Sequence, residues 1–483
     1  MKRYITEITR LKRRAYAELA RIALAGRLTE EIDYLPQRLV KDGITISRCC
    51  EHKERAVITD RLRLALGFAP EECGGERLSH TARRALAKGT PAGPVIEVLG
   101  SACDRCPIDK IVVTNACRNC SAHHCRAVCP REAIDIIAGR AYVNQERCVA
   151  CGQCAGACPF GAIIPVERPC EAACAVKAIT PDVNQRASIN RDKCTNCGAC
   201  VGACPFGAIG DRTALVQVAG WLTGEADKRP VAMLAPSFVG QLGPEVSPGQ
   251  LAQALIALGF VAVSEVAAGA DLVAAHEAEE YARRVPQETP FMTSSCCPAF
   301  VHLVKKHFPR LEVHLSRTLS PALALAAELR QVQPGRPLVF IGPCLAKKGE
   351  AAASGLVDAV LTFEELGALL VGGGINAAAQ AKVALGNEPS PEARGFGVSG
   401  GVARTLAERL GGSYTAACAS GLADCQKKLR LAAAGRLGAG FLEGMACAGG
   451  CCFGPGVLVP GEVSGPAMEN FAGIPSVHRG ETA

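Results

Sequence analysis

Apolar residues recur at three- or four-residue intervals near the start of the chain. Lysine and arginine fill the positions between them, and the apolar positions are Ile5, Ile8, Leu11, Ala15, Leu19 and Ile22. This spacing places the apolar side chains on one face of a helix. We expect residues 1–95 to form a helical region that packs through this face and turns a basic face to solvent.

From about residue 228 the pattern changes to short apolar runs that alternate with helical stretches. The runs predict buried strands at 230–234, 259–263, 337–341 and 358–361. Helices are expected at 247–258, 272–284, 321–329 and 363–370. This alternation predicts an α/β unit with parallel strands, in which ligands bind at the carboxyl ends of the strands. The whole chain is therefore expected to be a multidomain protein of α+β and α/β class.

The composition is that of a globular protein with many cysteines. Hydrophobic residues make up 49% of the chain and charged residues 20%, which argues against disorder. The 27 cysteines cluster at Cys-x-x-Cys spacings, which indicates metal binding in a reducing compartment. The N-terminal segment lacks the apolar core of a signal peptide, and no run of 18 uncharged apolar residues occurs. We expect a cytoplasmic protein without a membrane span.

Two cysteine runs have the spacing of bacterial ferredoxins. Each reads Cys-x-x-Cys-x-x-Cys-x-x-x-Cys-Pro, over 148–159 and 194–205, and a third run at 117–130 has a longer middle spacer. In such runs three thiolates bind one 4Fe-4S cluster and the fourth binds its neighbour. Crossed ligation predicts one cluster on Cys117, Cys120, Cys125 and Cys158, and another on Cys148, Cys151, Cys154 and Cys129.

The run at 194–205 has an incomplete partner upstream. By the crossing rule Cys174 completes a third cluster with Cys194, Cys197 and Cys200. Sixteen thiols lie in this region, enough for four cubanes. We therefore hypothesise a fourth cluster on Cys103, Cys106, Cys170 and Cys204, the alternative being three accessory clusters with these four thiols unligated.

Three further cysteine islands lie in the α/β region, at 293–300, 342–350 and 443–452. In the third, two thiols four positions apart enclose a Gly-Gly pair that lets backbone approach a bulky cluster. In order and content the islands resemble the three signature segments of the FeFe (iron-only) hydrogenases. The resemblance covers most of residues 100–460.

The resemblance implies an H-cluster, which is a cubane linked through one cysteine to a di-iron unit with CO, CN and azadithiolate ligands. By motif the cubane ligands are Cys297, Cys344, Cys447 and Cys451, with Cys451 as the bridge. Cys296 matches the thiol that exchanges protons with the azadithiolate amine. Lys347 matches a lysine that donates to a cyanide, and Lys348 is expected at the surface. The walls around the di-iron unit are matched by Ala235, Pro236, Ser237, Pro321 and Met445.

Three residues of the predicted helix 272–284 lie on one face. Glu277, Glu280 and Arg284 stand at i, i+3 and i+7. By position they resemble the proton relay of the family, in the order Cys296, water, Glu277, Ser316, Glu280, Arg284. A solvated charged face is the alternative.

Some positions depart from the family pattern. Gly342 stands where many members have methionine, Phe300 where the best-known members have tryptophan, and Cys452 adds a thiol beside the bridge. The rate, catalytic bias and oxygen tolerance of the family therefore cannot be assigned to this protein. Outside the pattern, Cys49 and Cys50 lie near His52 without a second ligand pair, and Cys73 is taken as structural.

The formal charge of +7 counts every cysteine as neutral. Five cubanes with four thiolates each would bring it to roughly −3 at about −2 per cluster. Because basic residues are scattered and aromatics make up only 4%, nucleic-acid binding is not expected.

The resemblance implies an enzyme that catalyses 2H+ + 2e− ⇌ H2 and exchanges electrons with ferredoxin through its accessory clusters. It also implies maturation proteins that supply the di-iron unit. The alternatives are a hydrogen or redox sensor of low turnover and an iron-sulfur assembly protein related to the family. We predict a helical region at 1–95, a ferredoxin-like domain at 96–212, an H-cluster domain at 228–460 and a C-terminal tail at 461–483.

Overall fold

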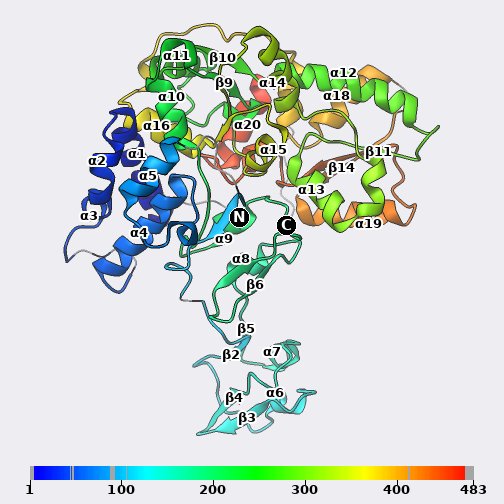
Figure 1. The fold of residues 1–483 in the computed structure, drawn as a ribbon. Coiled ribbons are helices and arrows are strands. Elements are labelled where there is room, and N and C mark those ends of the chain that lie inside the picture. Colours follow the sequence, from blue (N-terminus) through cyan, green and yellow to red (C-terminus); the bar gives the residue numbers. More distant parts are fainter. Residues whose placement is uncertain are drawn as a thin grey trace.

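The structure is a computed structural model that describes residues 5–43, 45, 48–87, 93–104, 106–411 and 414–473. Figure 1 shows a broad body and a narrow arm that projects from it. The body contains the N-terminal helices and most of the chain after residue 212, and the arm contains β2–β7. Among the described helices, none has both the length and the apolar composition needed to cross a membrane.

The N-terminal region is helical, as its apolar spacing predicts. It consists of α1 (Glu7–Leu24), α2 (Leu28–Glu31), α3 (Leu35–Leu39), α4 (Glu51–Ala65) and α5 (Leu78–Ala87). Leu11, Ala15 and Leu19 of α1 are buried, whereas Ile5, which precedes the helix, is exposed. Helix α1 packs on α16 (Phe363–Gly372). The contact is so close that a Cβ added at Gly372 would lie 2.7 Å from the backbone nitrogen of Arg21.

The arm is built from small antiparallel pairs and single-turn helices. The pairs are β2 (Ile111–Val113) with β5 (Ile163–Pro165), β3 (Ile134–Ile137) with β4 (Arg140–Val143), and β6 (Ile179–Pro181) with β7 (Ala187–Ile189). At its base β1 (Ile96–Val98) pairs with β8 (Ile209–Asp211). The helices are α6 (His124–Ala127), α7 (Gln153–Ala157), α8 (Pro169–Ala172) and α9 (Ala199–Ala203). Its cores are a few isoleucines and valines packed with cysteines, so they need the additional stabilisation that metal clusters give.

The body contains a four-stranded parallel sheet in the order β10-β9-β12-β13. Its strands are β9 (Val231–Leu234), β10 (Ala262–Glu265), β12 (Leu338–Ile341) and β13 (Ala359–Leu361). The two central strands are buried along their whole length, as expected where helices cover both faces. The helices near this sheet are α10 (Leu215–Thr223), α11 (Pro248–Leu258), α14 (Pro321–Val332), α15 (Ala346–Ser354) and α16.

This sheet confirms the predicted α/β layering, with two local corrections. The strand expected from residue 259 begins at Ala262, because Gly259 ends α11 with φ +119° and Phe260 still donates to the Leu255 carbonyl. The helix expected from residue 272 begins at Ala267, since the alanines before Asp271 extend it by more than a turn.

A second parallel sheet, in the order β11-β15-β14, has no counterpart in the predicted strands. Its strands are β11 (Met292–Thr293), β14 (Ala416–Ser420) and β15 (Phe441–Met445). They are short and contain Gly, Ala, Cys and Glu, so they lack the apolar run on which strand prediction relies. The remaining helices are α12 (Ala267–Arg284), α13 (Pro298–His307), α17 (Pro391–Arg394), α18 (Gly401–Leu410), α19 (Leu422–Ala433) and α20 (Gly461–Phe471).

Candidate functional site

The three cysteine islands follow the carboxyl ends of parallel strands. Cys297 follows β11 and is the N-cap residue of α13, and Cys344 lies between β12 and α15. Cys447 follows β15, and Cys451 begins the 3-10 helix Cys451–Phe453. Both sheets thus contribute loops to one region, as parallel sheets do for their ligands.

The four thiols of these islands are half-buried and lie within range of one another's charges. Burial raises the pKa of Cys447 well above its usual range, and the charges of Cys344, Cys297 and Cys451 raise it further. Burial and the charges of Cys344 and Cys297 likewise raise the pKa of Cys451. Lys347 opposes these shifts at both Cys344 and Cys451. Because such thiols shed their protons only when a metal replaces them, the donor set fits an iron-sulfur cluster.

Lys347 and Lys348 are adjacent in sequence and lie in different buried networks. Lys347 donates to Ser320 Oγ and to Glu350 Oε2, at 2.7 Å each. Lys348 was expected at the surface, and this is wrong. Its ammonium group is buried against Asp211 (2.6 Å) and Glu365 (2.9 Å), because α15 packs there on β8 and α16.

The residues matched to the walls of the di-iron unit come from β9, α14 and β15. Ala235, Ser237 and Met445 are buried, and Pro321 is the first residue of α14. The hydroxyl of Ser237 is buried without a hydrogen-bond partner among the described residues, which fits a polar group bound there.

The departures at Gly342 and Cys452 have structural counterparts. A Cβ at Gly342 would lie 2.7 Å from the Phe340 ring and 2.8 Å from Ala235 Cβ, so the phenyl ring takes the space of a side chain. Cys452 is buried, with its sulfur 3.1 Å from Met468 Sδ.

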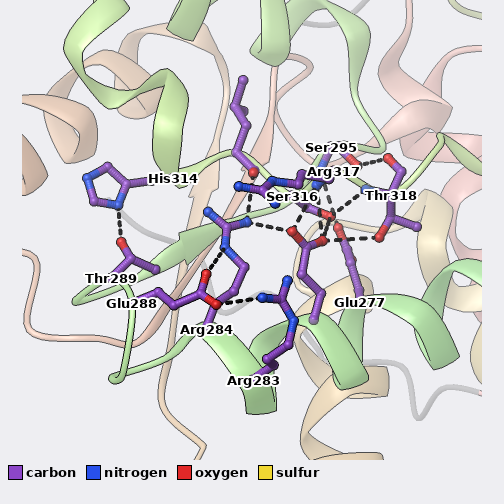
Figure 2. Close-up of polar contacts among 12 residues, drawn as sticks. Glu277, Arg283, Arg284, Glu288, Thr289, Ser295, His314, Ser316, Arg317 and Thr318 are labelled. Atoms are coloured by element: carbon purple, nitrogen blue, oxygen red, sulfur yellow. Dashed lines mark hydrogen bonds and ion pairs between the residues drawn. The ribbon is translucent and has the colours of Figure 1, made fainter.

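Glu277, Ser316 and Arg284 of the predicted relay lie in one region (Figure 2), and Glu280 contacts both Ser316 and Arg284. Glu277 lies beside Ser316 and accepts the Ser295 N–H at 3.4 Å. Ser316 donates to Glu280 at 3.0 Å, and Glu280 pairs with Arg284 at 2.5 Å. The charge of Glu277 also raises the pKa of Cys296, after the larger effect of burial.

Glu277 is protonated at neutral pH. It is fully buried in α12, and this burial raises its pKa to about 8. The nearby Ser316 hydroxyl and the Ser295 N–H oppose the shift, and the charges of Glu280 and Glu443 add to it. A carboxyl group with a pKa near the working pH can both take up and release a proton.

The cysteines of the arm and its base lie in four groups. The pKa of Cys125 is raised by burial and then by Cys158 and Cys120, and that of Cys154 by burial and then by Cys148 and Cys129. A pocket of the arm is lined by Cys129, Cys148, Cys151 and Cys154. The pKa of Cys200 is raised by burial and by Cys197, Cys194 and Cys174.

The fourth group contains the thiols that the spacing left over. Burial raises the pKa of Cys170 to about 11, with contributions from Cys204, Cys106 and Cys103. The four thiols of the hypothesised fourth cluster therefore lie near one another. In the other three groups the thiol predicted to cross from another run also lies near its group, namely Cys158 near Cys125, Cys129 near Cys154 and Cys174 near Cys200.

The third accessory cysteine group, which includes the loop at 194–200, lies against the three cysteine islands. A Cβ at Gly198 would lie 2.7 Å from Pro455 and 2.9 Å from Leu345, next to Cys344. Helix α13, which begins beside Cys297, contacts the same loop through Lys306, which donates to the Cys194 carbonyl at 2.7 Å. The charge of Cys197 also reaches Cys447. One accessory group is thus a direct neighbour of the four island thiols.

Sequence reasoning did not assign Glu350, Ser320 or Glu443. Glu350 pairs with Lys347 three residues before it on α15, a spacing that the sequence offers. Glu443 opens the third island and is fully buried in β15. In the sequence, the only indication that Glu443 has a role is that it is a single carboxylate between Leu442 and Gly444.

The fold and these thiol groups define an iron-sulfur protein with a ferredoxin-like arm. Residues 228–455 match the family described as "Iron only hydrogenase large subunit, C-terminal domain". Residues 141–164 and 187–210 match the 4Fe-4S binding domain. The chain is thus an FeFe hydrogenase-like protein, and residues 228–455 are its hydrogenase-family domain.

Among curated proteins, Iron hydrogenase 1 of Clostridium pasteurianum is 28% identical over 289 residues, covering 48% of this chain and 50% of that protein. The periplasmic [Fe] hydrogenase large subunit of Nitratidesulfovibrio vulgaris is 30% identical over 200 residues, covering 36% and 48%. The chain thus spans about half the length of these relatives. The solved [FeFe]-hydrogenase HydA1 of Chlamydomonas reinhardtii superposes with a TM-score of 0.45 at 21% identity, covering 55% of this chain and 90% of that one.

Proposed function

We propose that this protein is a hydrogenase that catalyses 2H+ + 2e− ⇌ H2. The observation that carries the proposal is that four half-buried thiols from three distant loops lie within range of one another's charges and near Cys296, whose pKa the charge of Glu277 raises. A cluster site and a proton donor at one place are what reversible proton reduction requires.

The cofactor would be held by Cys297, Cys344, Cys447 and Cys451. When bound, an H-cluster of one cubane and a di-iron unit with CO, CN and azadithiolate ligands supplies the reversible hydrogen chemistry. Lys347 and Ser237 are suited to donate hydrogen bonds to its anionic ligands, since Lys347 keeps one N–H beyond its two bonds and the Ser237 hydroxyl is unpaired among the described residues. Ala235, Pro236, Pro321 and Met445 would limit its movement and exclude water.

Protons would enter and leave through Arg284, Glu280, Ser316, Glu277 and Cys296. Ser316 donates to Glu280, Glu280 pairs with Arg284, and Glu277 lies beside Ser316, while a water is needed between Glu277 and Cys296. Glu280 pairs with Arg284, which in turn lies 3.9 Å from the exposed Glu288. The outer end of the relay is therefore close to solvent.

Electrons would move along the arm through four accessory cubanes on the sixteen thiols assigned above. The arm is narrow, with α6 and α7 at its outer end and α8 and α9 closer to the body (Figure 1), which supports a single electron path. A ferredoxin or a similar soluble carrier would dock on the arm in the cytoplasm, and maturation proteins would supply the di-iron unit.

The test is hydrogen evolution by the matured protein with a reduced low-potential carrier. We expect sustained turnover, and Cys296→Ala should abolish it while iron content stays unchanged, because only the proton donor is lost. A matured protein that binds hydrogen without turnover would support a sensor instead. A protein that never acquires the di-iron unit would support the assembly role.

A further inference from the structure

Glu443 is a fully buried carboxylate that the proposed relay does not use. It lies in β15, and its carboxylate accepts the N–H of Gly400 at 2.6 Å and of Ala403 at 2.8 Å, at the start of α18. In the parallel pairing of β14 and β15 it stands opposite Cys418. Paired residues project from the same face of a sheet, so the thiol and the carboxylate are neighbours.

The compartment that receives Glu443 also contains Glu277. Alternate residues of β15, Phe441 and Met445, pack with Tyr281 of α12 and with apolar residues of α18. Two polar atoms in this compartment are buried without a hydrogen-bond partner among the described residues, namely Glu277 Oε2 and the Tyr414 hydroxyl. Buried polar atoms are seldom left in this way, which indicates that they share water or protons.

The electrostatics agree with this arrangement. After burial, the charge of Glu443 is the largest influence that raises the pKa of Tyr414, followed by Cys418, Tyr281 and Glu277. Burial also raises the pKa of Glu443 to about 6, opposed by the Ala403 and Gly400 N–H groups and by Arg404. Cys296, Glu277, Tyr414 and Cys418 all respond to the charge of Glu443. The lower pKa of Glu443 makes it suited to accept a proton from Glu277.

The outward end of this compartment is β14. This strand is at the edge of its sheet, Ala416 is exposed, and Cys418 is half-buried near Lys428 of α19. Tyr414 and Cys418 thus lie near the exposed edge strand β14, where a proton can pass to solvent.

We propose that Glu443, with Tyr414 and Cys418, forms a second proton path between Glu277 and the surface at β14. Each transfer moves one proton and no electron. Glu277 gives its proton to the Glu443 carboxylate. Glu443 then gives a proton to Tyr414 or Cys418 as that group releases its own proton to water. The proposal rests on the proposed function, because Glu277 must exchange protons with the site.

A capping role for Glu443 alone is the competing explanation, and a double-mutant cycle separates the two. Glu280→Gln interrupts the first path beyond Glu277. In that background we expect Glu443→Gln to lower the remaining hydrogen-evolution rate by about tenfold, and in the wild type by less than about twofold. Equal factors in both backgrounds would overturn the second path and leave only the cap.

Tyr414→Phe repeats the cycle without touching the cap, in case Glu443→Gln does not fold. It should lower the rate several-fold only in the Glu280→Gln background. Tyr281→Phe is the matched control, because its ring packs edge-on against Tyr414 at 5.2 Å, and it should have no effect in either background. An identical loss in Tyr281→Phe would mean that removing any hydroxyl from this compartment has the same effect, and would overturn the path.

Infrared difference spectra against pH test Glu443 without any hydrogenase activity. In protein made without the di-iron unit, a carboxylic acid band should titrate near pH 6 and be absent in Glu443→Gln. If this band is seen but the matured protein evolves no hydrogen, the proposed function fails and the assignment of Glu443 as a titrating group survives. If no such band titrates, the second path is overturned even in an active enzyme.

Discussion

At the scale of single residues, Glu277 is the group through which both proposed proton paths would run. It is fully buried, it accepts the Ser295 N–H, and its pKa of about 8 follows mainly from desolvation. The sequence could suggest its role, since the spacing of Glu277, Glu280 and Arg284 places them on one helix face. The spacing could not show that this face is buried, which separates a relay from a solvated charged surface.

Replacing Glu277 by Gln should stop proton transfer without disturbing the site. Gln keeps the size of the side chain and can accept the Ser295 N–H, but it carries no exchangeable carboxyl proton. We expect hydrogen turnover to fall by about 100-fold or more. Turnover assays on matured protein check this, with iron content as the control, and turnover equal to wild type would remove Glu277 from the route.

The raised pKa of Glu277 also predicts a pH dependence of stability. The unfolded carboxyl loses its proton near 4.5 while the folded one keeps it to about 8, so the contribution of Glu277 is greatest below the first value and is lost between the two. The melting temperature of Glu277→Gln relative to wild type should therefore rise as pH increases from 5 to 9. Thermal unfolding across this range checks the sign, and a difference that stays constant would contradict the burial of a neutral acid.

At the scale of elements, helix α15 joins the islands to the rest of the body. It begins two residues after Cys344, presents Lys347 to Ser320, and turns Lys348 toward β8 and α16. The sequence predicted α16 and the strand before Cys344 from their apolar runs. It could not distinguish the two lysines by environment, because which side of α15 meets β8 depends on contacts over more than 130 residues of separation.

Lys348→Ala should destabilise the body strongly. It leaves Asp211 and Glu365 buried without their cation, and breaking such a pair costs about 3–5 kcal/mol. Lys228→Ala, which removes an exposed pair with Glu225, is the matched control and should not change the melting temperature. If the two variants melt alike, the buried network does not hold α15 in place.

At the scale of the whole molecule, the thiol groups form a series from the arm to the islands. The crossing rule predicted the pairings within the arm from spacing alone, because short spacers restrict which thiols can reach one cubane. The contact between the loop at Gly198 and the islands could not be predicted, because it depends on how the arm joins the body. The second sheet was missed for a related reason, since its strands gain their stability from packing rather than from composition.

The number of clusters is a property of the whole chain that iron analysis measures. Protein made without the di-iron unit should contain about 20 iron atoms if five cubanes form. Cys170→Ser, in the fourth accessory group, should lower this to about 16. Cys73→Ser replaces a buried thiol outside every group and should leave it unchanged. A wild-type content near 16 with no loss in Cys170→Ser would show that the fourth group binds no cluster.

Infrared spectroscopy of protein produced with the maturation proteins tests whether the four island thiols hold an H-cluster. We predict bands of iron-bound carbonyl and cyanide in the wild type that change under hydrogen, and their loss in Cys344→Ala while the iron of the accessory clusters remains. Matured wild-type protein with its full complement of accessory clusters and no such bands would contradict the account.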